Sequence, residues 1–193
     1  ATMLLNRRAN CSAAQTGIYR NLRTLVRHRK KLVVLKTEVR NRVHAVVDRL
    51  FPGFLNEKKS GITPFSNSSL YLMENSCSAQ QIRRRRRSTL CNILKRYGTA
   101  DPEATADKLQ SYAAQVLTTQ NQYAATLQLS LSHHIKLYRC LLENTEQLEK
   151  EIALPLAQSQ GAFLTSIKGI GIVLAAGVTA EIGSPFEQRP LNN

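Results

Sequence analysis

The sequence predicts an all-α protein in which two long helices form an antiparallel coiled-coil pair, joined by a basic helical insert and followed by a C-terminal helix-hairpin-helix. Three observations lead to this prediction. Apolar residues recur at heptad spacing in two long segments. Capping residues and helix stops bound the shorter segments between them. A Gly-Ile-Gly turn separates two apolar stretches near the end of the sequence.

The first long helix is predicted over residues 18–50, a rod of about 50 Å at 1.5 Å per residue. Its apolar or long side chains alternate steps of four and three, which is the spacing of a coiled-coil seam. The seam consists of Ile18, Leu22, Leu25, Arg29, Leu32, Lys36, Val39, Val43, Val46 and Leu50. Val26, Val33 and Val47 widen the stripe, as expected for a helix with more than one neighbour. A Pro-Gly pair after Phe51 ends the helix.

A second set of signals predicts shorter helices after the first long one. Residues 55–68 are polar and contain glycine and proline, so they are predicted to be a linker. A short helix is expected over residues 69–75. A longer single helix follows the N-cap Ser78 and runs to Gly98. Asp101, placed before a proline, predicts the start of one more helix.

The second long helix is predicted over residues 121–157. Its apolar positions repeat with the same period as those of the first helix. They are Tyr123, Leu127, Leu131, Ile135, Tyr138, Leu141, Leu142, Leu148 and Ile152. This helix also contains the acids Glu143, Glu146, Glu149 and Glu151. Two such helices separated by a helical insert predict an antiparallel pair, either within one chain or between subunits.

The glycine turn near the C-terminus predicts the helix-hairpin-helix. Gly169 and Gly171 permit positive φ and leave backbone N–H groups bare at the start of the next helix, where an anion is favoured. Lys168 adds a cation. The alternative is a purely structural αα-corner, because a glycine turn between packed helices needs no ligand. A membrane span is not predicted, because the uncharged run over 169–180 has 12 residues and a crossing takes roughly 20.

Basic residues are concentrated in the first half of the chain. The formal net charge is +14. Residues 1–97 contain 21 Lys and Arg against four acids, whereas residues 98–193 contain six against nine. A half-chain this basic repels itself unless an anion lies against it, so nucleic acid is the predicted partner.

Two groups of cations are the main candidates for phosphate contacts. One lies on the outward face of the first long helix, and the other is a run of five arginines in the insert. Acids that could pair with them at i,i+4 spacing are almost absent. The alternatives are a solvated helix exterior for the first group and a solubility or localisation feature for the second. The candidates are Arg20, Arg23, Arg27, Lys30, Lys31, Arg40, Arg83, Arg84, Arg85, Arg86 and Arg87, together with Lys168, Gly169 and Gly171 at the turn.

Other chemistries find little support in the sequence. The four cysteines lie far apart and share no metal-ligand spacing, so no metal or cofactor is expected in this chain. His133 and His134 are adjacent and would point about 100° apart on a helix. Aromatic residues are few and scattered, which argues against a base-stacking platform. The apolar run at the start is too short for a signal peptide, and the expected location is the cytoplasm, in association with the nucleoid.

Two segments resemble the insertion-sequence one-ten (IS-one-ten) transposases. The stretch "LTSIKGIGIVLAAGVTAEIG", residues 164–183, is similar to the start of that family's C-terminal domain, in which "SIPGIG…AA…AEIGD…F" recurs. Phe186 matches the trailing phenylalanine, whereas Lys168 stands where proline is usual and Ser184 where an acid is usual. Residues 19–54 independently resemble the family's basic helix, with its signature "LR.L.R.R..LV…..NR.H..LD..FPGF".

The resemblance implies a two-site enzyme. In the family, an N-terminal ribonuclease-H-like domain supplies a DEDD quartet of acids that binds magnesium, a central coiled coil assembles subunits, and a C-terminal domain carries a nucleophilic serine. Some members are guided by an RNA. Here no acid precedes Glu38, the match ends after Phe186, and Ser166 and Ser184 do not stand in the nucleophile's position. No catalytic residue is therefore assigned, and magnesium is expected only for the intact family enzyme.

This interpretation divides the chain into an N-terminal tail (residues 1–17), a basic coiled-coil domain (18–157) and a truncated C-terminal transposase domain (158–193). The expected function is the DNA- or RNA-binding and dimerising part of a transposase that performs DNA transposition and recombination. The chain would be a catalytically incomplete fragment whose partners are DNA, a guide RNA and further copies of itself, joined through the coiled coil. Two rivals stand beside it: a non-enzymatic RNA-binding coiled-coil protein, and a polyanion chaperone that binds acidic surfaces.

Overall fold

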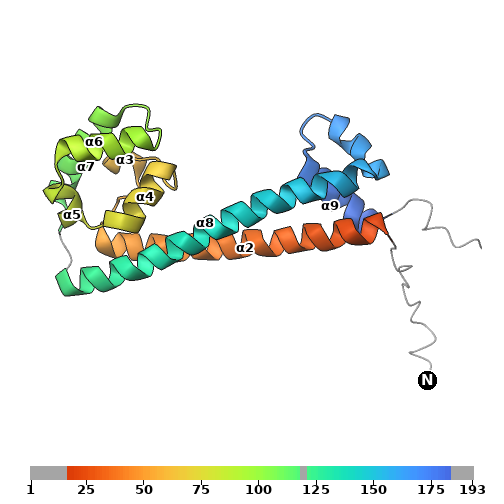
Figure 1. Cartoon of the computed structure of the whole chain (residues 1–193), viewed down its shortest axis with the longest axis horizontal. Helices are drawn as coiled ribbons and strands as arrows, with labels where there is room; N and C mark the ends of the chain where they lie inside the picture. The colour runs from red at the N-terminus through yellow and green to blue at the C-terminus, as the bar shows by residue number, and fades with distance from the viewer. Residues whose placement is uncertain (1–16, 118–120, 184–193) are drawn as a thin grey trace, which may run out of the picture. The chain divides into compact units, whose positions relative to one another are not determined.

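The computed structural model describes residues 17–117 and 121–183, and every regular element in these ranges is helical. The predicted all-α class is confirmed (Figure 1). Within the same ranges, no helix combines the length and the apolar character needed to cross a bilayer. The elements are α2 (Ile18–Leu50), α3 (Glu57–Ser60), α4 (Asn67–Ser76), α5 (Ala79–Arg84), α6 (Arg87–Arg96), α7 (Pro102–Gln115), α8 (Asn121–Ala157), the 3₁₀ helix η1 (Gln160–Ser166) and α9 (Ile172–Ile182).

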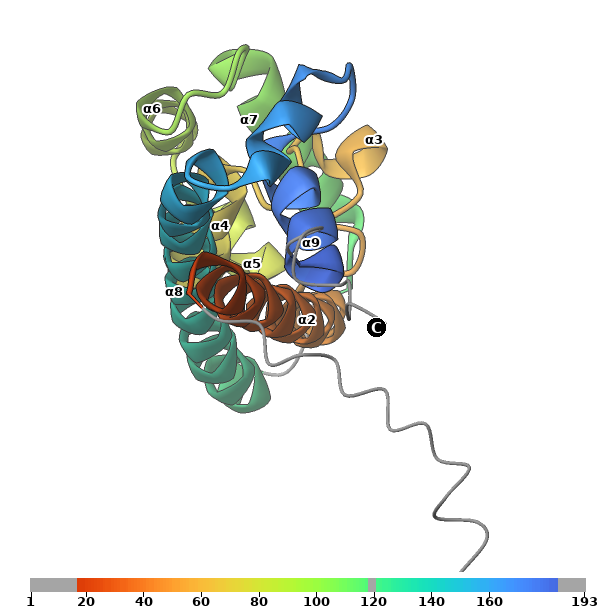
Figure 2. The ribbon, with the colours of Figure 1, turned by 90° about the vertical axis from the view of Figure 1, so that its right-hand side faces the viewer.

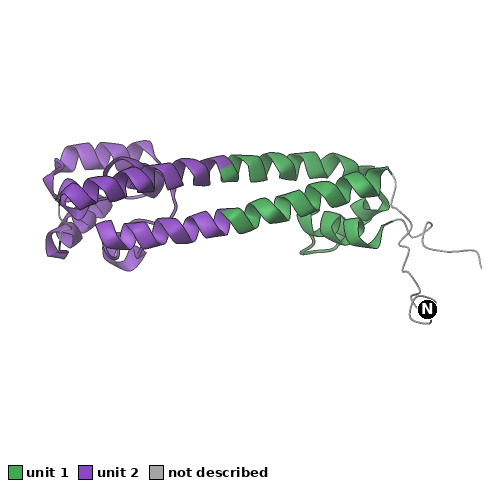
Figure 3. Cartoon of the chain, turned by 90° about the horizontal axis from the view of Figure 1, so that it is seen from below, with its two compact units in different colours: residues 1–35, 141–193 green, residues 36–140 purple. Residues whose placement is uncertain are grey.

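The helices group into two compact units (Figure 3). Unit 1 comprises residues 1–35 and 141–193, and unit 2 comprises residues 36–140. The long helices α2 and α8 therefore each contribute one part to each unit. The predicted N-terminal tail, apart from Gly17, lies outside the described residues, as do the C-terminal residues 184–193.

The first long helix has the predicted bounds, because α2 begins at Ile18 and ends at Leu50. None of its ten predicted seam residues is exposed. After the helix, the Phe51 backbone N–H still donates to the Val47 carbonyl at 2.7 Å, and Gly53 then takes a φ of +76°. A residue with a Cβ is disfavoured in that conformation, so the glycine allows the chain to turn away from the helix axis.

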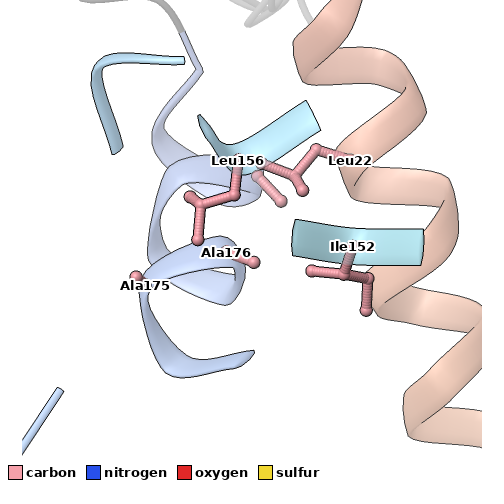
Figure 4. Packing of buried hydrophobic residues seen from close by; sticks show 6 residues of the cluster. Leu22, Ile152, Leu156, Ala175 and Ala176 are labelled. Atoms are coloured by element: carbon pink, nitrogen blue, oxygen red, sulfur yellow. The ribbon is translucent and has the colours of Figure 1, made fainter. Parts of the chain in front are cut away.

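Unit 1 is built from the first part of α2, the last part of α8, η1 and α9. Leu22 on α2 belongs to one buried cluster with Ile152 and Leu156 on α8 (Figure 4). Arg29, further along α2, bonds Glu149, which lies earlier on α8, so these two helix parts run antiparallel. The cluster is completed by the α9 residues Ala175, Ala176 and Ala180. Figure 2 shows α9 beside α2.

Small residues allow α9 to approach its neighbours closely. Gly161 on η1 lies directly against Thr179, and a Cβ at position 161 would overlap the threonine side chain. The Thr179 hydroxyl donates to the Ala175 carbonyl of its own helix at 2.8 Å, so its polar atom needs no other partner. The contact therefore depends on the absence of a side chain at Gly161.

Unit 2 has a core of large apolar side chains. Helices α3, α5 and α6 all pack against α7, and α4 packs against α6. The largest side chains with no exposed surface include Phe51, Phe54, Leu72, Met73, Ile82, Leu90, Leu94 and Leu109. The predicted cap of α7 is confirmed: the Asp101 carboxylate accepts from the Ala104 N–H at 3.0 Å, and proline occupies the first turn. The second long helix, α8, also has its predicted bounds.

Two sequence predictions for unit 2 were wrong, whereas the helix expected over 69–75 is confirmed as α4, which is longer by two residues at its start and one at its end. The expected linker over 55–68 contains α3 and the start of α4, because Asn56 and Ser66 cap short helices there. The expected single helix after Ser78 is two helices, α5 and α6, which are separated by an extended segment at Arg85 and Arg86.

Candidate nucleic-acid interface

The break between α5 and α6 turns the five-arginine run into a corner. Arg85 and Arg86 both have extended backbone, with ψ of 136° and 137°. The Gln110 side chain on α7 donates to the Arg85 carbonyl at 2.6 Å, which satisfies an acceptor that a continuous helix would have used internally. No proline or glycine marks this break, so contacts from α7 impose it.

Arg87 fixes the other side of the corner. Its Nε and Nη2 donate to the two carboxylate oxygens of Asp107 at 2.5 and 2.8 Å, and Nη2 lies 3.6 Å from Glu103. The hydrogen bond from Arg87 lowers the pKa of the Asp107 carboxyl, and the same bond raises the pKa of the guanidinium. Arg87 is thus an anchor for α6 on α7, not a free cation.

The other arginines of the run form no ion pair with α7 within the described residues. Arg83, Arg84 and Arg86 are exposed and Arg85 is half-buried. Within the described ranges, no carboxylate forms an ion pair with any of these four. Lys95 and Arg96, which sequence reasoning did not select, lie exposed in the last turn of the same helix α6. We refer to Arg83, Arg84 and Arg86 as the corner arginines. They are three exposed cations that no carboxylate of the described residues neutralises through an ion pair.

The predicted cationic ridge of α2 divides into two groups. Arg20, Lys30 and Lys31 are exposed, as predicted. Arg23 is half-buried, and its guanidinium donates to the Ala180 and Glu181 carbonyls at 2.8 and 3.1 Å. These carbonyls lie in the last turn of α9, where a cation is favoured by the helix dipole.

Arg27, the remaining ridge residue, is paired within unit 1. It bonds the Glu181 carboxylate at 3.2 Å, although its side chain is 59% exposed. An exposed pair of this kind opens at little cost, so phosphate could compete with Glu181 for the guanidinium. Arg23 and Arg27 thus hold α9 on α2 in this structure, and their contact with phosphate stays a prediction.

Arg40 lies beside a group of rings in unit 2. Its guanidinium carbon is 4.6 Å from the centroid of the Phe65 ring, which in turn lies 5.2 Å from both His44 and Tyr138. Phe65 has a φ of +58°, a left-handed conformation that is costly for a residue with a bulky side chain. Burial, and then the charge of Arg40, lower the pKa of His44 against the opposing effect of Asp48. Arg40 therefore already has an aromatic partner.

The glycine turn of unit 1 differs from the predicted hairpin in its first arm. That arm is the 3₁₀ helix η1 and not an α-helix. Gly169 has the expected positive φ, +94°, but Gly171 is extended and serves as the N-cap of α9. Lys168, Gly169 and Gly171 are all exposed, and an added Cβ at either glycine would meet no atom within 4 Å. The turn is thus open to solvent, and phosphate binding there stays a prediction.

Two aromatic residues that the sequence placed far apart come together in unit 2. Tyr71 on α4 and Tyr97 at the end of α6 stack with ring centroids 4.7 Å apart and planes at 26°. The scatter of aromatic residues along the sequence argued against a base-stacking platform, but the fold brings these two rings into one stack. No local pattern could have found it, because the two residues are brought together only by the packing of α4 on α6.

No group of three or more His, Cys, Asp or Glu residues within 17–117 and 121–183 is arranged to hold a metal ion. His133 is exposed and His134 is half-buried. In comparisons with known proteins, neither a family model, nor a curated protein, nor a solved structure matches the chain significantly.

Proposed function

We propose that this chain is the DNA- or RNA-binding and dimerising part of an IS-one-ten-type transposase. The observation on which the proposal rests is the set of corner arginines. They are exposed and lack a carboxylate partner in the described part of the chain, while Arg87 and Gln110 hold their backbone in a fixed bend. Exposed guanidinium groups on a held backbone are suited to phosphate, because no ion pair within the described residues has to be broken when the anion arrives.

The corner arginines belong to unit 2, and Arg20, Lys30 and Lys31 offer a second cationic surface on unit 1. Both surfaces are expected to contact the phosphate backbone and not base edges, which gives affinity without sequence recognition. Homo-oligomers would form through the long helices α2 and α8. Cleavage of DNA would need the acidic quartet and the serine of the intact enzyme. The resemblance of residues 19–54 and 164–183 to the family supports this part of the proposal.

The test of nucleic-acid binding is a salt titration. Fluorescence anisotropy would measure the affinity of the chain for a labelled duplex over a range of salt concentrations. Replacing Arg83, Arg84 and Arg86 together by glutamine should weaken binding and reduce the slope of log K against log salt by about 2.7, at roughly 0.9 per phosphate contact. The proposal fails if affinity and slope stay unchanged.

A matched control removes the same charge from the same unit. Lys58, Lys59 and Lys108 are exposed on α3 and α7, so replacing all three by glutamine lowers the net charge of unit 2 by the same amount. This variant should keep most of the salt slope. Equal losses in both triple variants would show that only net charge matters and that the corner has no special role.

A DNA-nicking assay tests the part of the proposal that concerns catalysis. The purified chain should not nick supercoiled DNA when magnesium is added. Magnesium-dependent nicking that disappears when acids of this chain are replaced would contradict the assignment of an incomplete enzyme. It would leave the nucleic-acid binding result standing.

A further inference from the structure

The Tyr71–Tyr97 pair combines stacked rings with nearby positive charge. Both tyrosines are half-buried, so each keeps some surface that is accessible to solvent. The Arg96 guanidinium carbon lies 5.8 Å from the centroid of the Tyr97 ring, and Arg96 itself is exposed. The packing of α4 on α6 thus holds the pair together, and the exposed Arg96 guanidinium lies over the Tyr97 ring.

Helix α6 links this pair to the corner arginines. Arg86 is the N-cap of α6 and Arg96 is its last residue, ten positions later, which corresponds to about 15 Å of helix. A single nucleic-acid strand lying along α6 would meet cations at both ends of the helix and aromatic rings at one end. Cations that track a backbone beside an aromatic stacking surface are the combination by which proteins bind single strands without reading sequence.

Duplex nucleic acid cannot use the rings in this way. Its bases are already stacked on one another, and its outer surface presents phosphates and groove edges. An unpaired base, in contrast, exposes both faces, and every base has a π-face that can cover a tyrosine or share the Arg96 guanidinium. The rings therefore distinguish a single strand from a duplex, whereas the corner arginines alone do not.

We infer that the Tyr71–Tyr97 pair, with Arg96, is a stacking site for an unpaired base, and that the chain prefers single-stranded nucleic acid at this end of α6. The inference deepens the proposed function and rests on it, since the corner arginines would hold the adjoining phosphates. RNA and DNA share the chemistry that is recognised, so either strand could supply the base.

The experiment compares Tyr97→Leu with the unaltered chain by fluorescence anisotropy. The probes are an oligouridylate, an oligothymidylate, an abasic strand of the same length and a duplex. Tyr97→Leu should weaken binding of both base-bearing single strands about tenfold, the effect of one lost stacked base. Binding of the abasic strand and of the duplex should not change. A larger loss for oligouridylate than for oligothymidylate would identify RNA as the preferred source of the base, and the reverse order DNA.

Two further variants distinguish the loss of base stacking from a change in the fold. Tyr97→Phe keeps the ring and should keep the affinity for single strands. Tyr123→Leu removes a tyrosine that is 49% exposed on α8, in the same unit, and should change nothing. Because the chain contains no tryptophan, its ultraviolet fluorescence comes from tyrosine. Oligouridylate should quench this fluorescence less in Tyr97→Leu than in Tyr123→Leu.

The outcomes distinguish this inference from the proposed function. If the unaltered chain binds abasic and base-bearing strands equally, and Tyr97→Leu loses no preference, the stacking site is refuted while nucleic-acid binding stands. If Tyr97→Leu weakens duplex binding as much as single-strand binding, the tyrosine acts only through the fold, which also refutes the site. If the unaltered chain binds none of the probes, both proposals fail together.

Discussion

Phe51 and Phe54 have no exposed surface in unit 2, in which leucine, isoleucine and methionine side chains are also fully buried. The buried cluster of unit 1 contains three alanines and only three larger residues. Large apolar side chains of unit 1 instead reach solvent: Leu154 is 66% exposed and Phe163 is 79% exposed. Burial of apolar area stabilises a fold by roughly 25 cal/mol per Å². We therefore expect unit 2 to hold most of the folding free energy and unit 1 to depend on closer, more easily disturbed contacts.

The two units also differ in whether their arginines have partners within the unit. Arg23, Arg27 and Arg29 of unit 1 all bond acceptors within that unit. The corner arginines of unit 2 have no such partners in the described residues. Three arginines thus help to hold unit 1 together, whereas in the five-arginine run of unit 2 Arg87 has that role and the corner arginines do not.

The largest predicted effect is in the core of unit 2. Phe54→Ala removes a fully buried ring and should lower the free energy of unfolding by about 3–5 kcal/mol. Urea unfolding followed by circular dichroism measures the loss, and hydrogen exchange locates it in residues 36–117. Phe54→Leu is the matched control and should lose less. An equal loss of protection in α9 would contradict the separation into two units.

A smaller effect is expected where α9 meets η1 in unit 1. Gly161→Ala places a methyl group against Thr179 and should cost about 1–3 kcal/mol, because the backbones must move apart. Gly177→Ala is the control on α9: its added Cβ meets nothing within 4 Å, so it should be neutral or stabilising. Hydrogen exchange of α9 amides distinguishes the two. If Gly161→Ala leaves them slow, the close contact is not what holds α9.

The ion pairs of unit 1 should contribute less to the free energy of unfolding than the contact between Gly161 and Thr179. A double-mutant cycle on Arg29 and Glu149, whose side chains are 24% and 40% exposed, should give a coupling energy of about 0.5–1 kcal/mol. The same cycle on the more exposed pair Arg27–Glu181 should give a smaller value. Thermal unfolding at two salt concentrations measures both. A stronger coupling for the exposed pair would show that exposure does not rank these contacts.

The smallest effect is a pH dependence of unit 2. Burial lowers the pKa of His44 in the folded chain, so the unfolded chain binds the proton more tightly. Stability from this residue is present above the ordinary histidine pKa of about 6.5 and is lost as the pH falls through the lower folded value. Because His44 is partly solvated, we expect only about a few tenths of a kcal/mol.

Variants at two histidines isolate this pH effect. His44→Gln should flatten the pH dependence of unit 2 between neutral and mildly acidic solution. His28→Gln, at an exposed position in unit 1, should leave it as it is. Urea unfolding at several pH values provides the comparison, and an unchanged slope in His44→Gln would refute the role of this histidine.

The long helices could be predicted from sequence because their signals are local. Heptad spacing gave the bounds of α2 and α8, and Asp101 before proline gave the start of α7. The corner between α5 and α6 could not be predicted, because arginine favours a helix and the groups that break it lie 20 to 25 residues later on α7. The Tyr71–Tyr97 stack and the bond from Arg23 to Ala180 also join distant positions.

The candidate site could therefore be predicted only in part from the sequence. Charge density singled out the five-arginine run, since no fold buries five consecutive arginines. It could not separate the arginine that fixes the backbone from those that face outward, because the five residues are chemically identical. Their difference lies in the carboxylates that the fold brings to Arg87.

The Arg87 anchor has a consequence for how the run would behave under systematic mutagenesis. Replacing each corner arginine and Arg87 in turn by alanine should give four similar binding defects with two separate origins. The three corner variants would each remove one phosphate contact, and the remaining affinity would still fall with salt. Arg87→Ala would release Asp107 and let the bend relax, so that the corner arginines lose their position while keeping their charge.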